Sequence, residues 1–420
     1  MSNGKDDPVL TAPKQPECNI GTIGHVDHGK TTLVEALTGV WASRHSEELR
    51  RGITIKLGYA DAAIYKCPRC SAPECYSTSA TCPVCGSRAE FQRSVSFVDA
   101  PGHEILMTTM LSGAAVMDGA ILVIAADEPC PQPQTKEHLA AISIMGLSKL
   151  IIVQNKIDIV TNEDAVKSYN QIRKFVSGTI AENAPIIPVS AQHRVNIDLL
   201  IDSMEHNIPT PHRDLNKPPR MHIVRSFDIN KPGTSVEKLE GGVLGGSITQ
   251  GKIKIGDELE ILPGLPIRDK NRLEMHPLHT EVSSLFAGEG PVDEALSGGL
   301  VGVGTYLDPS ATKTDGLVGS MAGKPGILPQ VLDEISLDVS LFDVVVGSED
   351  MRKVENITTR ENLLLNVGTS RTMATVTQIS KGHIEAKLSI PVCCEEKSRI
   401  AISRRIGGRW RLIGYGVTGG

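Results

Sequence analysis

The chain has 420 residues, of which 40% are hydrophobic and 22% are charged, and its formal net charge is -6. This length exceeds what one hydrophobic core usually serves, so two or three domains are expected. The composition excludes a disordered chain, and the charge excludes a globally basic nucleic-acid binder, so any contact with RNA must come from local basic patches.

The sequence also argues against membranes and disulfides. It has no apolar run long enough to span a bilayer, and the polar opening MSNGKDDP is unlike a signal peptide. We therefore expect a cytoplasmic protein that binds no membrane. Four of the nine cysteines form two Cys-x-x-Cys pairs. In a reducing cytosol this pairing favours a metal site over disulfides.

Three folded segments are predicted after a proline-containing tail at residues 1–16. Within 17–211, continuous apolar runs alternate with helical windows, which is typical of a doubly wound, mostly parallel α/β sheet. Residues 212–325 and 326–420 consist of short β-rich runs separated by glycines, which favour two β-barrels.

The stretch Gly24 to Thr31 reads GHVDHGKT and has the spacing of a phosphate-binding loop between a strand and a helix. Backbone N–H groups can converge there on an anion at the helix N-terminus. Lys30 would reach the β and γ phosphates, and Thr31 would give its hydroxyl to Mg²⁺. The alternative is a glycine-rich turn without a ligand. The other predicted contacts of this loop are Asp27, His28, Gly29 and Thr32.

A second motif, DAPGH, follows the apolar strand VSFV. Asp99 would hold Mg²⁺ at the carboxyl end of that strand. Gly102 would bring its backbone N–H to the γ phosphate, and His103 would orient the attacking water. Taken alone, the motif describes a turn followed by a surface histidine.

A third motif, NKID, predicts the base. The Asp158 carboxylate can accept both hydrogens that guanine offers at N1 and N2, whereas adenine would leave it unpaired, at a cost on the order of 1 to 3 kcal/mol or more. The nucleotide is therefore expected to be GTP or GDP. The predicted base-site residues are Asn155, Lys156, Asp158, Ser190, Ala191 and Gln192.

Between the first two motifs lies RGITI. Its Thr54 is the candidate for a loop that closes on Mg²⁺ and the γ phosphate and opens after hydrolysis. The alternative is an exposed threonine at the start of a strand. Lys30, Thr54, Asp99 and His103 are thus the predicted catalytic set, with Thr31, Thr54 and Asp99 around Mg²⁺.

In their order, these motifs resemble the translational GTPases that carry aminoacyl-tRNA, the group that includes bacterial elongation factor Tu. The resemblance implies that the two barrels are the second and third domains of that family. It also implies that Val26 and Ile53 form an apolar gate beside His103, and that hydrolysis stays slow until a partner or the ribosome completes the site.

Two Cys-x-x-Cys pairs lie within residues 65–88. Four thiolates at the ends of a short loop can surround Zn²⁺ tetrahedrally, and a glycine after the second pair lets backbone N–H groups approach the sulfurs. The predicted ligands of this zinc ribbon are Cys67, Cys70, Cys82 and Cys85. Cys75 lies inside the same loop and leaves the identity of the fourth ligand open.

The ribbon, RGITIKLGYADA and EPCPQPQTKEHL together resemble the gamma subunits of archaeal and eukaryotic translation initiation factor 2. That resemblance implies a heterotrimer with alpha and beta subunits that delivers methionyl initiator tRNA to the small ribosomal subunit, with GTP hydrolysis as the release switch and no role for DNA. It also implies that the second domain binds the alpha subunit and the aminoacylated end of the tRNA.

Two alternatives remain open. A selenocysteine-specific elongation factor shares the GTPase domain and barrels but usually has a further C-terminal domain. An assembly scaffold with incidental turnover is the other alternative, although intact DAPGH and RGITI motifs argue against an inactive site.

Basic residues of the barrels are candidates for tRNA contacts, although solvated surface is the commoner role of such charges. In the second domain they are Arg220, Arg225, Lys252 and Arg268. In the third, five arginines and Trp410 lie between Arg399 and Arg411, a composition that fits RNA phosphates and a stacked base. Equally, arginines that alternate with apolar residues describe a barrel strand with one solvated face.

Overall fold

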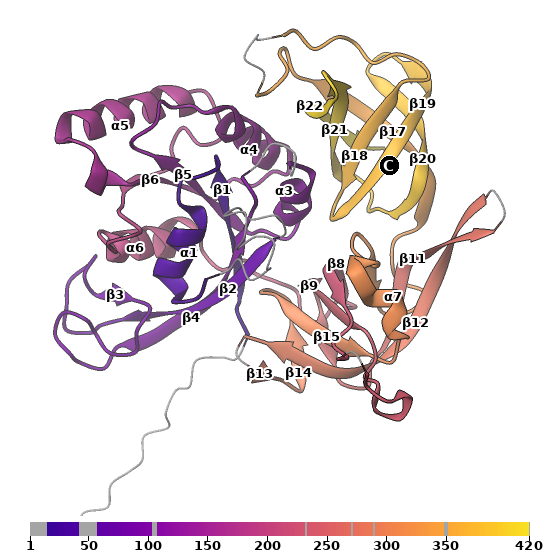
Figure 1. Ribbon diagram of the computed structural model, residues 1–420, viewed down its shortest axis with the longest axis horizontal. Helices are drawn as coiled ribbons and strands as arrows, with labels where there is room; N and C mark the ends of the chain where they lie inside the picture. Colours follow the sequence, from indigo (N-terminus) through magenta and orange to yellow (C-terminus); the bar gives the residue numbers. More distant parts are fainter. Residues whose placement is uncertain are drawn as a thin grey trace, which may run out of the picture.

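The computed structural model describes residues 15–41, 57–102, 107–231, 233–269, 272–288, 290–347 and 352–419. An α/β unit is followed by two β-barrels, which confirms the predicted fold class (Figure 1).

The α/β unit is built on a seven-stranded sheet in the order β3-β2-β4-β1-β5-β6-β7. Its strands are β1 (Cys18–Gly24), β2 (Gly58–Lys66), β3 (Tyr76–Ser77), β4 (Glu90–Asp99), β5 (Gly119–Ala125), β6 (Leu150–Asn155) and β7 (Ile186–Pro188). The β1, β5 and β6 strands are buried throughout, and the five strands from β4 to β7 run parallel. The antiparallel β2 and β3 form one edge. The continuous apolar runs in the sequence thus correspond to strands covered on both faces.

Helices cover both faces of this sheet. The helices are α1 (Lys30–Thr38), α3 (Met107–Ala114), α4 (Pro133–Ile144), α5 (Asn162–Val176) and α6 (Ile197–Asn207), with a short 3₁₀ turn η2 (Ile157–Ile159). Apolar side chains of α1 and α6 share one core, and those of α3, α4 and α5 share the other. The phosphate-loop segment runs from the end of the central strand β1 into α1, at the edge where the parallel strands end.

The second unit is a closed barrel of β8, β9, β11, β12, β15 and β16, because β11 pairs with both β12 and β16. Its elements are β8 (Arg220–Phe227), η3 (Val236–Lys238), β9 (Val243–Gln250), β10 (Lys252–Lys254), β11 (Glu258–Asp269), β12 (Arg272–Ala287), β13 (Gly290–Pro291), β14 (Glu294–Leu296), β15 (Val301–Thr305), α7 (Pro309–Thr312), η4 (Lys313–Asp315) and β16 (Met321–Gly323). The β11–β12 hairpin extends beyond the barrel (Figure 1).

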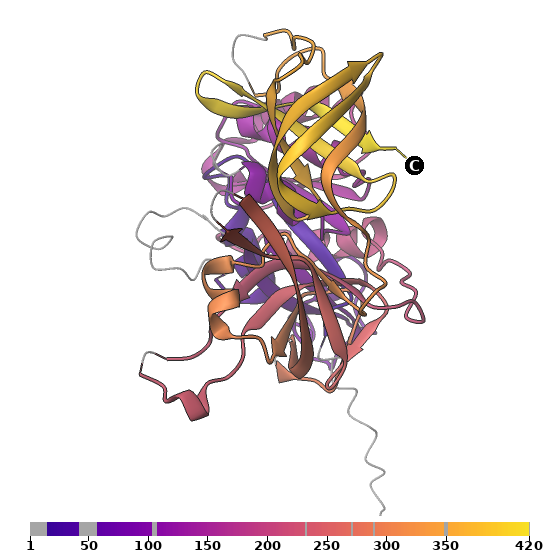
Figure 2. The same cartoon turned by 90° about the vertical axis from the view of Figure 1, so that its right-hand side faces the viewer.

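The third unit is a second closed barrel, in the order β17-β20-β19-β18-β21-β22. Its strands are β17 (Val331–Leu341), β18 (Asn362–Val367), β19 (Ser370–Ser380), β20 (His383–Cys393), β21 (Arg399–Ile406) and β22 (Arg409–Thr418). The two barrels lie one above the other beside the α/β unit (Figure 1), and in the turned view they lie in front of it (Figure 2).

Polar contacts join the units. The Nη1 of Arg411 on β22 lies 2.5 Å from Oε1 of Glu137 on α4, and this ion pair is largely buried. At the other barrel, Asn19 of β1 donates a hydrogen bond to Ser247 Oγ at 3.0 Å. The α/β unit is therefore attached to each barrel through buried polar groups.

Within the described residues, no helix has both the length and the apolar character needed to cross a membrane.

Candidate nucleotide site and zinc ribbon

The phosphate loop is tied to the sheet by one amide side chain. Asn155 Nδ2 donates to the carbonyl of His28 at 2.9 Å, and Asn155 Oδ1 accepts from the backbone N–H of Ala191 at 3.0 Å. Gly29 has a φ of 85°, and a Cβ at this position would lie 2.3 Å from Asn155 Nδ2. Only glycine satisfies both the left-handed backbone and this close approach.

Lys30 lies at the bottom of the loop and is 7% exposed. Its Nζ donates to the carbonyl of His25 at 2.6 Å, and a Cβ on Gly102 would lie 2.4 Å from the same nitrogen. Burial lowers the pKa of Lys30 to about 8, although the carboxylates of Asp99 and Asp27 oppose this shift. A phosphate would supply the nearby negative charge that favours the protonated amine.

Asp99 is fully buried at the end of β4 and is held by two hydroxyls. Thr31 Oγ1 donates to its Oδ2 at 2.6 Å, and Thr22 Oγ1 donates to its Oδ1 at 2.9 Å. A carboxylate and a hydroxyl beside a phosphate site are the oxygen donors that Mg²⁺ prefers. The predicted pair Thr31 and Asp99 therefore lies together and fits this ion.

Asp158 lies in the η2 turn after β6. A hydrogen bond from the Ser190 side chain holds the pKa of Asp158 below its usual value, against the opposing effect of desolvation, and His193 Nε2 lies 3.6 Å from its Oδ2. The carboxylate is thus charged at neutral pH and restrained in position. The adjacent Lys156 has a φ of 63° and places its Nζ 3.2 Å from Asp127 Oδ2.

These residues surround a cavity of about 400 Å³. Its walls are formed by Val26, Asp27, Gly29, Lys30, Thr31, Thr32, Trp41, Gly102, Asn155, Lys156, Asp158, Ile159 and Gln192. Residues predicted from three separate sequence motifs thus enclose one space, which is large enough for a nucleotide-sized ligand.

Three predicted contact residues are buried next to the cavity wall and do not line the cavity itself. The His28 ring is buried under the loop, 3.0 Å from the carbonyl of Val123 and 3.3 Å from Glu128, and burial lowers its pKa to about 4. Ser190 and Ala191 are buried as well. Their polar groups hold Asp158 and Asn155, so a direct contact from Ala191 to guanine O6 stays a prediction.

Thr54, Ile53 and His103 lie outside the described residues. Their assigned roles in closing the magnesium site, gating and orienting water stay predictions. Val26, the other residue of the predicted gate, lies in the cavity wall.

Sequence reasoning missed Trp41 and Ile159, which both line the cavity although 41% and 62% of their surfaces are exposed. Trp41 follows the C-terminal end of α1, and the helix begins at the phosphate loop with Lys30. Because α1 carries the chain about 13 Å away from the phosphates, Trp41 is placed for the sugar and base half of a ligand. A large aromatic residue just after the loop's helix was the only available signal.

Trp41 is expected to report nucleotide binding optically. In a Trp410→Phe protein, whose remaining tryptophan is Trp41, excitation should transfer energy to a bound N-methylanthraniloyl-GDP. The same transfer should be absent from Trp41→Phe, in which only Trp410 of the third barrel remains. Loss of the covered apolar surface in Trp41→Ala should weaken GDP binding by roughly 1 to 2 kcal/mol. Equal transfer in both single-tryptophan proteins would contradict this placement.

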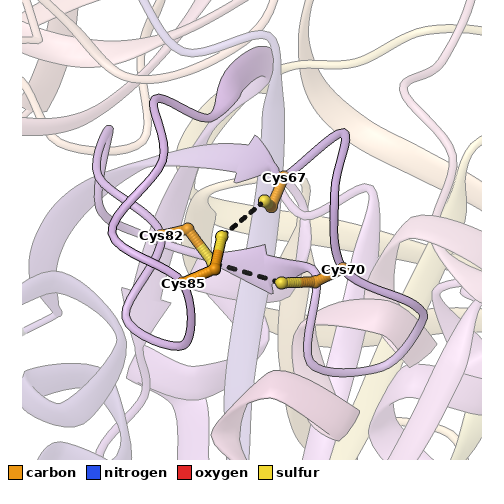
Figure 3. A group of neighbouring side chains, drawn as sticks. All are labelled: Cys67, Cys70, Cys82 and Cys85. Carbon is orange, nitrogen blue, oxygen red and sulfur yellow. Dashed lines mark hydrogen bonds between the residues drawn. The ribbon is translucent and has the colours of Figure 1, made fainter.

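The four predicted zinc ligands converge at the end of the α/β unit (Figure 3). Cys67 and Cys85 have sulfurs 3.5 Å apart, those of Cys70 and Cys82 are 3.7 Å apart, and all four lie within 4.8 Å of one another. Tetrahedral Zn²⁺ with bonds of about 2.3 Å requires sulfur separations of about 3.8 Å. The donor set therefore fits a structural zinc ion.

Hydrogen-bond donors surround the sulfurs of the ribbon, and the role expected of Gly86 in letting backbone N–H groups approach them stays a prediction. Gly86 has a φ of 69° and gives its N–H to the carbonyl of Cys82 at 2.9 Å. The sulfurs receive hydrogen bonds from Arg69 N–H to Cys67, at 3.4 Å, and to Cys85 from Ser87, the residue that follows Gly86. Such donors stabilise thiolates bound to a metal.

Cys75 is separate from this group. It is buried, and its carbonyl accepts from Cys67 N–H at 2.7 Å, but its thiol is not part of the four-sulfur cluster. The geometry therefore favours the two Cys-x-x-Cys pairs as the ligands, and the identity of the fourth ligand stays a prediction.

Most candidate tRNA-binding side chains of the second unit have acidic partners. Arg220 pairs with Glu395 of the third barrel, Arg225 Nε lies 3.0 Å from Asp315, and Lys252 Nζ lies 2.7 Å from Glu294. The side chain of Arg268 lies outside the described residues. The three described side chains therefore have acidic partners within the protein, and their contact with tRNA stays a prediction.

The arginines of the third unit divide in the same way. Arg404 pairs with Glu361 and donates to the carbonyl of Glu355 at 2.8 Å, while Arg411 joins the barrel to α4. Arg399 Nη1 donates to the carbonyl of Ile144 at 3.4 Å. Arg405 is exposed and stays a candidate. Thus three of the five arginines in the β21–β22 stretch contact other parts of the protein. The alternation of arginine with apolar residues in the sequence did not distinguish such contacts from RNA binding.

Three family models match successive parts of the chain. "Elongation factor Tu GTP binding domain" matches residues 15–210, "Elongation factor Tu domain 2" matches 241–317, and "Initiation factor eIF2 gamma, C terminal" matches 333–418. These matches coincide with the three structural units.

Similar proteins cover nearly the whole chain. Translation initiation factor 2 subunit gamma of Pyrococcus abyssi is 62% identical over 404 residues, which are 96% of this chain and 98% of that protein. The subunit of the same name from Archaeoglobus fulgidus is 58% identical over 402 residues, with 96% and 94% coverage.

Two solved structures share the fold. A bacterial selenocysteine-specific elongation factor superposes with a TM-score of 0.72 at 22% identity over 96% of this chain, which spans 58% of that protein. The elongation factor SelB of Methanococcus maripaludis, solved with a GTP analogue, gives 0.71 at 22% identity over 97% of this chain and 80% of its own. At this identity the likeness concerns the fold alone.

Proposed function

The chain belongs to the family of translation initiation factor 2 gamma subunits, and from this premise we propose that it carries methionyl initiator tRNA to the small ribosomal subunit while GTP is bound. As a member of this GTPase family it acts in translation initiation, with GTP or GDP, Mg²⁺ and Zn²⁺ as its cofactors. The observation that carries the proposal is one cavity lined by Lys30, Thr31 and Asp158, with the buried Asp99 hydrogen-bonded to Thr31, in a unit packed against two barrels.

The proposed chemistry is attack of water on the γ phosphate. Lys30 stabilises the charge that develops on the phosphoryl oxygens, and Thr31 and Asp99 hold the site of Mg²⁺, which neutralises phosphate charge when bound. Thr54 closes over the γ phosphate, and His103 orients the water. Release of phosphate relaxes the Thr54 and Gly102 regions, so the tRNA dissociates.

The proposed assembly is a heterotrimer with alpha and beta subunits that acts in the cytoplasm, without DNA. Large exposed apolar side chains support binding to partner proteins, among them Val166 and Tyr169 on α5 and Phe286 and Tyr306 in the second unit, which are 40% to 70% exposed. We place the domain limits at 17–211, 212–325 and 326–420, because the described elements of the three units fall within them.

Protection of the ester bond of methionyl-tRNA from hydrolysis tests this function. The purified chain, with and without the alpha subunit, should protect methionyl initiator tRNA in the presence of a non-hydrolysable GTP analogue and not in the presence of GDP. Methionyl elongator tRNA is the matched control and should be less protected. The aminoacylated end becomes inaccessible only when the protein covers it.

Two other results would point elsewhere. Preferential protection of selenocysteyl-tRNA would favour the elongation-factor alternative. Indifference to both tRNA and nucleotide, in protein that binds GDP normally, would favour an assembly scaffold in which turnover is incidental.

A further inference from the structure

The α4 helix contacts the start of the phosphate loop through a buried histidine. His138 is 1% exposed, and its Nδ1 accepts a hydrogen bond from the backbone N–H of Gly24 at 2.9 Å. Gly24 ends β1 and is the first residue of GHVDHGKT. The position of the loop's entry is thus fixed by a side chain that no nucleotide-binding motif contains.

The chemistry of this contact is well defined. Because Nδ1 accepts a hydrogen bond, the ring proton lies on Nε2. Burial lowers the pKa of His138 to about 3, with Lys30, His25 and His28 acting in the same direction, so the ring is neutral at physiological pH. Gly24 has little freedom to move away, because a Cβ there would lie 2.2 Å from the carbonyl oxygen of Val123 on β5.

The neighbouring residue of α4 contacts the third barrel. Glu137 is 2% exposed, and Arg411 Nη1 of β22 lies 2.5 Å from its Oε1. The barrel backbone also approaches closely, since a Cβ on Gly347 would lie 2.3 Å from the same carboxylate oxygen. Two consecutive residues of one helix therefore contact the phosphate loop and the third barrel.

We propose that His138 is a positioning residue for the phosphate loop and that α4 couples nucleotide retention to the seating of the third barrel through Glu137 and Arg411. The inference rests on the proposed nucleotide site and extends it to regulation by the barrel. A displaced barrel would move α4, and the Gly24 N–H would lose its acceptor. An unpaired buried N–H is unfavourable, so the loop would adopt other positions that bind phosphates less well.

Three substitutions of His138 test the positioning role in the full chain. Asparagine places its Oδ1 near the position of Nδ1 and should keep GDP dissociation close to the normal rate. Glutamine places its polar atoms one carbon further out, and leucine has no acceptor, so both should release labelled GDP about tenfold faster or more. Thermal melting of each variant separates this effect from a general loss of stability.

The glutamine and asparagine variants form the decisive pair, because both keep a polar amide at a buried position. Equal GDP dissociation from the two, at the normal rate, would overturn the positioning role even if the leucine variant fails to fold. Failure of the unmodified chain to bind GDP would instead overturn the proposed nucleotide site.

A second pair of proteins tests the coupling. The double variant Glu137→Gln, Arg411→Met removes both charges of the contact between α4 and the barrel and should speed GDP release. Its matched control is Glu361→Gln, Arg404→Met, which removes an ion pair inside the same barrel. Faster release in both proteins, or in neither, would overturn the coupling. When His138→Gln is combined with the first pair, the rate increases should be less than multiplicative, since both changes act through α4.

Discussion

Substitution of Asp158 by asparagine is expected to abolish the preference for guanine nucleotides and to transfer it to xanthine nucleotides. Loss of two charge-assisted hydrogen bonds should weaken GTP binding by about 3 to 6 kcal/mol, or roughly a hundredfold to ten-thousandfold. An asparagine amide can donate to the C2 carbonyl of xanthine and accept from its N1–H, which replaces the lost pairing. The site geometry supports this exchange of base specificity, because a hydrogen bond from the Ser190 side chain restrains the side chain at position 158.

Competition of unlabelled GDP and XDP with labelled nucleotide measures this exchange directly. Asp164→Asn is the matched control, since it removes an exposed carboxylate at the start of α5 and should leave both affinities unchanged. Ser190→Ala should reduce GDP affinity without creating affinity for XDP. A mutant at position 158 that still prefers GDP would show that the base lies elsewhere in the cavity.

The sequence predicted the parts of the site whose chemistry is local. Lys30 and Thr31 end a loop of fixed spacing, and Asp99 follows a run of buried residues that forms β4. Parallel strands place their carboxyl ends at one edge, so motifs far apart in sequence meet there. The two cysteine pairs likewise define their own geometry, because a short loop joins them.

The remaining features depend on neighbours that no local pattern specifies. His28 lies within the phosphate-loop motif, but its ring points to Val123 and Glu128 because Asn155 holds the backbone carbonyl of the same residue. His138 has no distinguishing pattern in the sequence, and its role appears only when α4 packs beside β1. Side-chain direction at these positions is decided by packing between elements.

The arginines of the third barrel show the same limit. Alternation of Arg404 with apolar residues predicts one solvated face, yet three strands lie in sequence between it and its partner Glu361. A charged side chain that meets a carboxylate during folding stabilises the barrel, and one that does not stays available to RNA. Sequence alone cannot assign these two fates.

Loss of a zinc ligand is expected to disorganise the ribbon while leaving the nucleotide site intact. The purified chain should contain one zinc ion, and Cys67→Ser or Cys82→Ser should lose it. Structural zinc in small peptides contributes an apparent 10 to 16 kcal/mol, on the order of the whole stability of a domain. Among the described residues of this segment, regular structure is limited to the two-residue strand β3, which pairs with β2, and an isolated bridge between Thr81 and Arg88.

The distance between the two sites explains why nucleotide binding should survive. β4 begins at Glu90 beside the ribbon and ends at Asp99, which is hydrogen-bonded to Thr31 of the cavity wall, and its ten residues span roughly 30 Å. The parallel strands that carry the nucleotide site are buried by helices on both faces of the sheet, and this packing does not depend on the zinc ion. Hydrogen exchange should therefore become fast between residues 67 and 88 in the Cys82→Ser protein, with GDP affinity unchanged.

Cys75→Ser provides the matched control, since it alters a cysteine of the same loop whose thiol lies outside the four-sulfur cluster. Its zinc content, measured by atomic emission on dialysed protein, should equal that of the unmodified chain. Loss of zinc from this variant would mean that Cys75 is a ligand and that one of the paired cysteines is not. If Cys75→Ser retains zinc and Cys82→Ser loses it, the ion belongs to the two Cys-x-x-Cys pairs. The comparison is matched, because each protein lacks one thiol of the same loop and the two differ only in which sulfur is missing.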